Sequence, residues 1–325
     1  MSRIKKSNYC MAIFILTLIF IFTMGLTSFA ANKAISIGTG GVTGTYYPLG
    51  GCIANIISQY VEGVFATAET SGGSVANMRM VQNGEVQLAF VGSTSGYQVF
   101  SGLPPYDKEP PGDKARSIAA LYPEVYQLIV LKNSGINSIA DLKGKKVAVG
   151  APGSGTEYAG KIILEEHGIN YENITPNFLS FGEGVTALKD GFVDAVVIFA
   201  GIPTSSVIDV SSTLNVKLLS LDPEAKKRLL KNNKLYTPVT IPKDMYRGME
   251  ENVNTLGTPA LLVTNVEQDE EFIYKITKVI FEHTKELANA HAKGKDITLE
   301  TAAVGLSIPL HPGAEKYYKE VGIVK

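Results

Sequence analysis

Residues 78–93, MRMVQNGEVQLAFVGS, align without a gap on residues 185–200, VTALKDGFVDAVVIFA. Gly84 falls on Gly191 and Val86 on Val193, and both segments have the pattern of a helix, a glycine turn and a buried strand. Upstream, residues 44–47 (GTYY) correspond to residues 155–158 (GTEY), at nearly the same separation along the chain. Although any two βα units share part of this pattern, the repeat predicts two lobes of similar βα construction.

Outside the repeat, short β-branched segments alternate with helical ones. The predicted strands are Ala34–Gly38, Phe65–Thr70, Val86–Val91, Ile118–Leu131, Lys145–Gly150, Val193–Ala200 and Ala260–Thr264. The predicted helices include Leu49–Tyr60, Val75–Asn83, Glu157–His167 and Gly182–Lys189. This alternation predicts an α/β fold built on largely parallel sheets.

Two of the predicted strands are suited to connect the lobes. Ile118–Leu131 is long for a single strand, and Ala260–Thr264 is its natural return. We therefore expect a hinge of two crossing strands. Lobe 1 is predicted over residues 31–120 plus 251–325, the crossover over 121–132, and lobe 2 over 133–250.

Three glycine-rich turns are the candidate binding elements: residues 37–48 (IGTGGVTGTYYP), 70–74 (TSGGS) and 150–156 (GAPGSGT). Glycine lets the backbone approach a ligand, and the N–H groups of a following helix attract anions. The spacing matches neither a dinucleotide-binding fingerprint nor a phosphate loop. Most glycine turns only reverse the chain, but three with hydroxyl-bearing neighbours predict a small polar or anionic ligand.

Composition and motifs exclude several other functions. The formal net charge of −1 gives no reason to expect nucleic-acid binding. No nucleophile elbow or zinc-protease motif is present, the four histidines are scattered, and Cys52 is the type of residue that packs as a small hydrophobe. We expect no catalytic residue, no metal and no cofactor, and a monomeric chain.

The first thirty residues have the pattern of a secretory signal peptide. Basic residues open the chain, residues 12–26 are apolar, and Ser28-Phe29-Ala30 supplies the small residues of a cleavage site. The apolar run reaches about 22 Å, short of the roughly 30 Å hydrocarbon core of a bilayer, although an uncleaved anchor is the alternative. Cys10 precedes the run, so it is not a lipid-bearing cysteine. The sequence therefore predicts an exported protein cleaved near Ala30.

From Ala31 onward the chain resembles the TAXI family of extracytoplasmic solute receptors, which serve TRAP-type (tripartite ATP-independent periplasmic) transporters. The motifs that carry the resemblance are GTGGVTGTYYPLGGCIANIIS, TSGGSVANMRMVQNGEVQLAFVGS, ALYPEV, GKKVAVGAPGSGTE, LKDGFVDAVVIFAGIPT and IPLHPGAEKYY. The chain departs from many relatives at Gly92 and Thr94, positions that concern the ligand rather than the fold.

The resemblance implies a two-lobed periplasmic binding-protein fold, type II-like. It implies a receptor that closes on a small organic anion or an amino acid such as glutamate, and a membrane TRAP permease as partner. The implied ligand-binding residues, which the glycine-rich turns support, are Gly41, Thr45, Tyr46, Tyr47, Ser71, Gly73, Ser74, Arg79 and Ser93 in lobe 1, and Gly153, Ser154, Gly155, Thr156, Phe199, Ala200 and Gly201 in lobe 2.

Within this set, N–H groups at the helix starts after Ser74 and Ser154 are expected to hold a carboxylate, and Arg79 to supply a cation. A surface salt bridge is the alternative role of Arg79, and core packing that of Tyr47. Three other functions remain open: a receptor for an ABC transporter or a sensor kinase, an enzyme on the same fold, and an adhesin.

Overall fold

The computed structural model describes residues 33–325, and the predicted signal peptide lies outside that part. Residues 34–325 pack as one unit. Within the described residues, no helix is long and apolar enough to cross a membrane.

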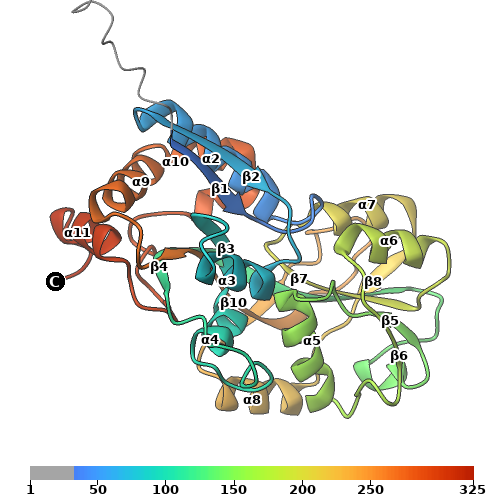
Figure 1. Cartoon of the computed structure of the whole chain (residues 1–325). Helices are drawn as coiled ribbons and strands as arrows, with labels where there is room; N and C mark the ends of the chain where they lie inside the picture. Colours follow the sequence, from blue (N-terminus) through green and yellow to red (C-terminus); the bar gives the residue numbers. More distant parts are fainter. Residues whose placement is uncertain (1–32) are drawn as a thin grey trace, which may run out of the picture. The chain divides into compact units, whose positions relative to one another are not determined.

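One mixed β-sheet runs through this part of the chain, with the strand order β2-β1-β3-β10-β4-β7-β5-β6; β8 pairs with β4, and β9 with β10 (Figure 1). The strands are β1 (Lys33–Gly38), β2 (Val64–Glu69), β3 (Leu88–Gly92), β4 (Ala115–Leu131), β5 (Lys146–Ala148), β6 (Thr175–Asn177), β7 (Ala195–Ala200), β8 (Val216–Leu218), β9 (Thr237–Ile241) and β10 (Val253–Asn265). Pairing is parallel for β1 with β3 and for β5 with β6 and β7, and antiparallel wherever β4 or β10 takes part. The prediction of an α/β fold is confirmed.

The helices lie on both faces of this sheet. They are α2 (Tyr46–Tyr60), α3 (Ser74–Gln82), α4 (Ser93–Phe100), α5 (Gly155–Glu166), α6 (Phe181–Lys189), α7 (Ser205–Thr213), α8 (Pro223–Asn232), α9 (Glu270–Glu282), α10 (Thr284–Ala290) and α11 (Pro312–Glu320), with short 3-10 helices η1 (Ile139–Leu142) and η2 (Ala292–Asp296).

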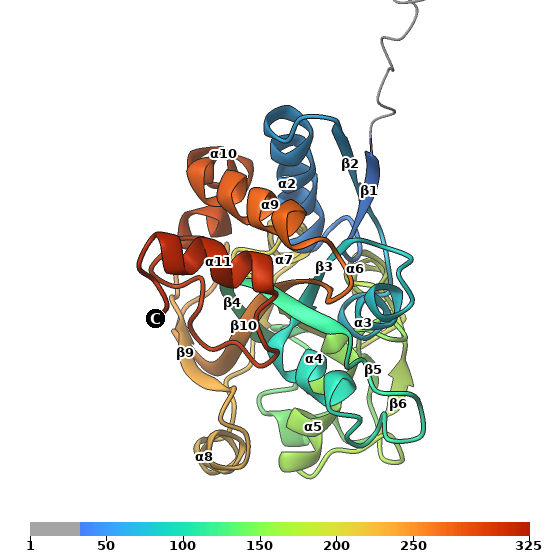
Figure 2. The same ribbon diagram turned by 60° about the vertical axis from the view of Figure 1, so that its left-hand side comes forward.

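In the first half of the fold, the sheet has a hydrophobic core on each face. Leu88 and Phe90 of β3 pack in the same cluster as α2, α9 and α11, while Ala89 and Val91 pack with α3 and α4 on the opposite face. Figure 2 shows α2, α9 and α11 on one side of β3 and β10. Because a strand alternates its side chains between faces, burial of both faces explains why β3 reads as a continuous apolar run.

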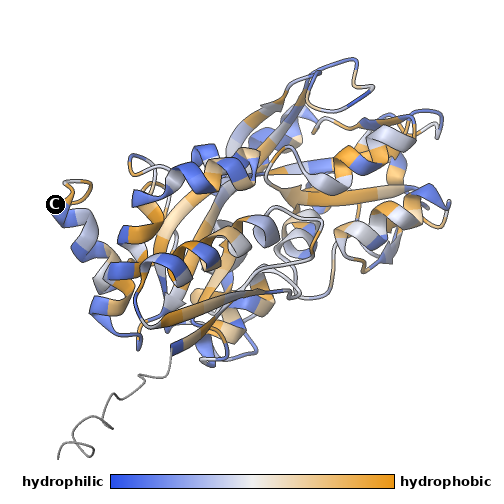
Figure 3. Cartoon of the chain, turned by 90° about the horizontal axis from the view of Figure 1, so that it is seen from above, coloured by the Kyte–Doolittle hydropathy of each residue, from blue (hydrophilic) through white to orange (hydrophobic). Residues whose placement is uncertain are grey.

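The second half repeats this arrangement. Val197 of β7 packs in the cluster of α5 and α8, while Val196 and Ile198 pack with α6 and α7. The strands in Figure 3 are accordingly hydrophobic through the middle of the molecule, with polar residues on the outer helix surfaces.

The internal repeat is visible in the hydrogen bonds that end α3 and α6. Gly84 and Gly191 both have φ of 74°, a left-handed conformation that suits glycine. Their N–H groups donate to the carbonyls of Val81 and Leu188, three residues earlier in each case. Both α3 and α6 therefore end in a Schellman motif, which directs the chain into the buried strand that follows.

β4 and β10 belong to both halves, as predicted for the hinge. The first part of β4 pairs with β10, and its last part, from Val125 to Val130, pairs with β7. β10 pairs with β9 over Val253–Gly257 and with β3 over Ala260–Thr264. The return strand therefore extends well beyond the predicted Ala260–Thr264. The lobe boundaries themselves stay a prediction.

Segments with a weak hydrophobic periodicity were not predicted from the sequence. The short strands β6, β8 and β9 and the helices α4, α7 and α8 have no predicted counterpart. His283 and His291 are the N-cap and C-cap residues of α10. These elements depend on tertiary contacts that local pattern does not record.

The crossing of β4 and β10 requires a glycine at residue 257. A Cβ there would lie 2.5 Å from the carbonyl oxygen of Glu124 and 3.0 Å from Val239. Gly257→Ala is therefore expected to lower the free energy of unfolding in urea by at least about 2 kcal/mol. At Gly51 on α2 a Cβ would meet nothing within 4 Å, so the control Gly51→Ala should stabilise the protein by roughly 0.5–1 kcal/mol. Equal effects of the two substitutions would contradict the close approach.

Candidate functional site

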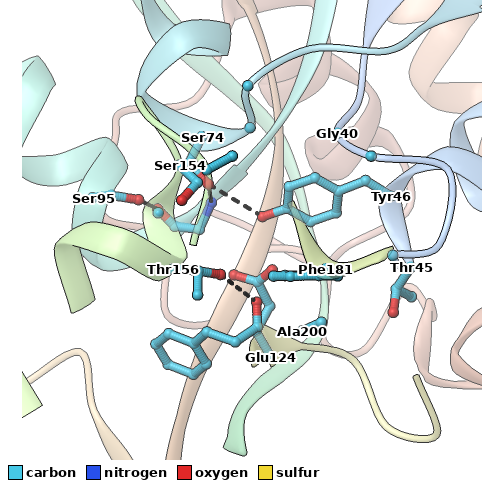
Figure 4. Close-up of a pocket in the computed structure, with 18 of the residues that line it drawn as sticks. Gly40, Thr45, Tyr46, Ser74, Ser95, Glu124, Ser154, Thr156, Phe181 and Ala200 are labelled. Carbon is cyan, nitrogen blue, oxygen red and sulfur yellow. Dashed lines mark hydrogen bonds between the residues drawn. The ribbon is translucent and has the colours of Figure 1, made fainter. Parts of the chain in front are cut away.

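The three glycine-rich turns meet around one cavity between the two halves of the fold (Figure 4). The cavity has about 730 Å³ of empty space including its opening, and the centre of a water molecule can reach about 90 Å³ of it. One water needs about 10–15 Å³ on the second measure. The enclosed part therefore has room for a small molecule.

Tyr46 enters the cavity from the turn between β1 and α2. Thr45 is the N-cap residue of α2, so Tyr46 occupies the first helical position. The Tyr46 ring packs against Phe90 with 5.1 Å between centroids. Its hydroxyl lies 3.5 Å from Oγ of Ser74 (Figure 4). The ring is thus fixed by the core while the phenol faces the cavity.

Asn77 on α3 holds the other two segments of this lobe in place. Its side-chain amide donates to the carbonyl oxygens of Thr39 and Phe90, each at 2.7 Å. Its Oδ1 accepts a hydrogen bond from Oγ of Ser71 at 2.6 Å. Asn77 is fully buried, and both its side-chain nitrogen and its side-chain oxygen take part in hydrogen bonds. This network links the ends of β1 and β3 to the Ser71 turn.

In the second lobe, capped helices begin at the cavity wall. Oγ of Ser154 accepts the Glu157 N–H at 3.0 Å and so caps α5. Ser180 forms a capping box with Glu183 at the start of α6. Each cap satisfies N–H groups that would otherwise lack an intrahelical partner, which fixes where the helix starts.

The two lobes touch each other around the cavity. The N–H groups of Val75 and Ala76 both donate to the carbonyl of Gly153 at 3.1 Å, and Oγ1 of Thr45 donates to the carbonyl of Gly201 at 3.1 Å. The expectation that N–H groups after Ser74 hold a carboxylate is therefore wrong for Val75 and Ala76, because Gly153 already occupies them. The arrangement described is a closed one.

Glu124, on the hinge strand β4, is the ionisable residue that the sequence analysis missed. It lines the cavity with only 6% of its surface exposed. Burial raises the pKa of the Glu124 carboxyl to about 8, and the neighbouring Tyr46 phenol opposes this shift only in part. Burial and the nearby Glu124 also raise the pKa of the Tyr46 phenol.

Most of the residues predicted to bind a ligand lie together on the cavity wall, although their contact with a ligand stays a prediction. Those lining it are Gly41, Thr45, Tyr46, Ser71, Gly73, Ser74, Ser154, Gly155, Thr156, Phe199 and Ala200. Oγ1 of Thr156 also donates to the carbonyl of Phe199 at 3.4 Å.

Five predicted residues do not line the cavity. Arg79 lies in the last turn of α3, away from its cavity end, and pairs with Glu109. Tyr47, one position beyond Tyr46, is 37% exposed. Side chains at these positions point elsewhere because a helix turns by about 100° per residue. The others are Ser93, which is fully buried, and Gly153 and Gly201, which form the contacts between lobes.

The cavity wall also includes residues outside the predicted ligand-binding set. They are Gly40, Gly44, Gly72, Gly92, Thr94, Ser95, Glu124, Ala151, Ser180 and Phe181, of which Gly92 and Thr94 had been noted only as positions that concern the ligand. The glycines and Ala151 belong to the predicted turns or to the end of β3. A charged residue inside the apolar stretch around ALYPEV was the available indication for Glu124, because a buried acid in a strand needs a specific reason.

The ligating groups of a metal site are not assembled here. Among the described residues, no three His, Cys, Asp or Glu side chains come together as metal ligands would. Within the same part of the chain, Cys52 is a free thiol.

The fold and this cavity define the chain as an α/β protein of two lobes that enclose a cavity. More specifically, the chain belongs to the NMT1-like family, whose model matches residues 37–322. A relative from Escherichia coli (strain K12), whose name assigns it to aliphatic sulfonates, is 29% identical over 126 residues, 39% of this chain. The match spans only 34% of that relative.

Solved structures share the fold at low sequence identity. A protein of Bordetella bronchiseptica RB50 has a TM-score of 0.54 at 20% identity, over 89% of this chain and 82% of its own. PhnD1 of Prochlorococcus marinus (MIT 9301), solved in complex with methylphosphonate, has a TM-score of 0.54 at 13% identity, over 90% of this chain and 100% of its own.

The burial of Glu124 makes the stability of the empty protein depend on pH. Between about pH 4.5 and 8 the unfolded chain loses this proton and the folded protein keeps it, so stability falls as pH rises. Glu124→Gln removes this cost. In thermal unfolding it should stabilise the protein by on the order of 4 kcal/mol at pH 8 and by less than about 1 kcal/mol at pH 5.

The matched control is Glu62→Gln, on the exposed turn after α2, which should show no such pH-dependent gain. An equal effect of Glu124→Gln at pH 5 and pH 8 would mean that Glu124 ionises normally in the folded protein.

Proposed function

We propose that this protein is an extracytoplasmic receptor that closes its two lobes on a small solute and delivers it to a membrane transporter. The observation that carries the proposal is the cavity itself, which is lined from both lobes and lies beside strands that belong to both. Membership of a fold used for periplasmic solute binding supports it.

Binding works through a shift in population between open and closed forms. A solute that touches both lobes favours the closed form by its difference in affinity for the two forms. The hydrogen bonds of Thr45 to Gly201 and of Val75 to Gly153 add to closure without touching the solute. The transporter then recognises the closed surface.

The solute class we propose is a small organic anion or an amino acid such as glutamate. The helix starts at the cavity support an anion, and so does the relative named for aliphatic sulfonates. The size of the enclosed space supports a molecule of a few heavy atoms. Binding without chemical transformation is part of the proposal.

Export and the transporter partner form a second part of the proposal. Residues 1–30 support secretion with cleavage near Ala30. The motif resemblance favours a TRAP permease of the TAXI type, whereas the Escherichia coli relative favours an ABC transporter as the partner. Co-purification from the source membrane distinguishes them, because an ABC partner brings an ATPase subunit and a TRAP partner does not.

The test is a thermal-unfolding screen of the chain from Ala31 with carboxylates, sulfonates, phosphonates, amino acids and sugars. A solute at one hundred times its dissociation constant should add about 2.7 kcal/mol to the stability. Gly155→Val should then weaken binding at least tenfold, because a Cβ at Gly155 would lie 2.7 Å from Ser74 Oγ and 2.8 Å from Ser95 Oγ of the facing lobe.

Because that clash arises only when the lobes close, the empty variant should unfold within about 1 kcal/mol of the wild type. Gly51→Ala, away from the cavity, serves as the control for affinity. Wild-type affinity in Gly155→Val would place the solute elsewhere, and a screen in which nothing stabilises the wild type would contradict the receptor function.

A further inference from the structure

The cavity wall has an unusual balance of charged groups for a site that binds anions. Among the described residues that line it, Glu124 carries the one carboxyl group, and no Lys, Arg or His is present. The candidate cation, Arg79, is paired with Glu109 outside the cavity. An anionic solute therefore meets a buried acid and no side-chain cation to balance it.

Five helices nevertheless start at this cavity. Their N-terminal residues on the wall are Thr45 and Tyr46 for α2, Gly73 and Ser74 for α3, Thr94 and Ser95 for α4, Ser154 to Thr156 for α5, and Ser180 and Phe181 for α6. Each helix N-terminus carries roughly half a positive charge. Two of these starts already have partners, because the Gly153 carbonyl accepts the first N–H groups of α3 and the Glu183 carboxyl lies in the capping box of α6. The other helix starts still favour an anion over an ammonium group.

Glu124 must be neutral for an anion to stay bound. Two negative charges a few ångströms apart in a dry cavity repel strongly, and one of them takes up a proton instead. The enclosed position of Glu124, 6% exposed, leaves little water to screen this repulsion. A protonated carboxyl has one O–H donor, which turns a repulsive neighbour into a hydrogen-bonding one.

The groups facing Glu124 fit this state. Tyr46 from α2 and Tyr122 on β4 are both uncharged phenols held well above their usual pKa by burial. Thr258, opposite on β10, is also uncharged. The nearby cation is Lys293 of η2, an element that packs against β4, and its Nζ lies 2.7 Å from the carboxyl of Asp296, with which it pairs. These neighbours supply no cation that would hold Glu124 ionised.

We propose that Glu124 is a specificity-determining residue that stays protonated and donates a hydrogen bond to an anionic group of the solute, so that one anion and one proton are bound together. This inference rests on the proposed receptor function and goes further by assigning the group that recognises the solute charge. The proton is shared between the Glu124 carboxyl oxygen and the solute oxygen as donor and acceptor, with no bond to carbon formed or broken.

The pKa of about 8 for Glu124 sets the pH range in which the affinity for an anionic solute changes. Below about pH 7 the acid is neutral in the empty site and affinity for an anion is flat, and between pH 7 and 8 the affinity falls about twofold. Above pH 8 binding must take up a proton, and affinity falls, by about fivefold between pH 8 and 9 and about tenfold per unit beyond. An ammonium group paired with ionised Glu124 gives the opposite slope, with affinity rising from pH 6 to 8.

The experiment is calorimetric titration of the chain from Ala31 at pH 6, 7, 8 and 9 with three probes: succinate and methanesulfonate, which lack an amine, and L-glutamate. At pH 9, repeating the titration in buffers of different ionisation enthalpy measures proton uptake. We expect close to one proton taken up per anion at pH 9 and almost none at pH 6. This measurement needs no variant, so it holds even if a substitution impairs folding.

Two substitutions sharpen the result. Glu124→Gln has an amide donor at every pH and should abolish the decline in affinity between pH 8 and 9. Glu124→Leu has no donor and should weaken binding at least tenfold at pH 7. Gly51→Ala, remote from the cavity, should keep the wild-type slope.

Three outcomes overturn the proposal in distinguishable ways. Affinity that rises from pH 6 to 8, with a loss of a hundredfold or more in Glu124→Gln, would assign Glu124 to an amine of the solute. Anion binding without proton uptake at pH 9 would remove Glu124 from charge recognition while leaving the receptor intact. Failure of every probe and of the wider solute screen at all four pH values would overturn the receptor function together with this inference.

Discussion

The antiparallel pairing of β4 with β10 is the constraint on which the rest of the structure depends. The crossing of the two strands joins both halves of the fold, because β4 also pairs with β7 and β10 also pairs with β3 and β9. Glu124 sits in this crossing opposite Thr258, and the glycine at residue 257 allows the two backbones to meet there. Glu124, the acid that faces the cavity, therefore lies on a strand that pairs with elements of both halves of the fold.

The fold was predictable to a large degree because its determinants are local. The Schellman motifs at Gly84 and Gly191 require glycine, and the strands that follow are buried on both faces. The local order of residues therefore indicates the helix, the turn and the strand. The three glycine-rich turns were predictable as cavity elements for the same reason.

The sequence did not indicate in which direction the side chains of the site residues point. Tyr46 and Tyr47 are adjacent residues of the same type, yet Tyr46 faces the cavity and Tyr47 is partly exposed. Arg79 was attractive as the cation an anion needs, but its helix carries it to Glu109. Glu124 lay inside an apolar strand, where only the closed arrangement of both lobes shows that its side chain meets the cavity. In the proposed site, helix ends and a neutral acid recognise the charge of the solute, so no cationic residue is needed that a sequence motif could have indicated.

A solute bound at this cavity is expected to draw the two lobes together. Small-angle X-ray scattering on the chain from Ala31, with and without a saturating solute identified by the screen, measures this movement. We expect a smaller radius of gyration with solute in the wild type and no such decrease in Gly155→Val. An unchanged radius in the wild type at full occupancy, established by calorimetry on the same sample, would contradict it.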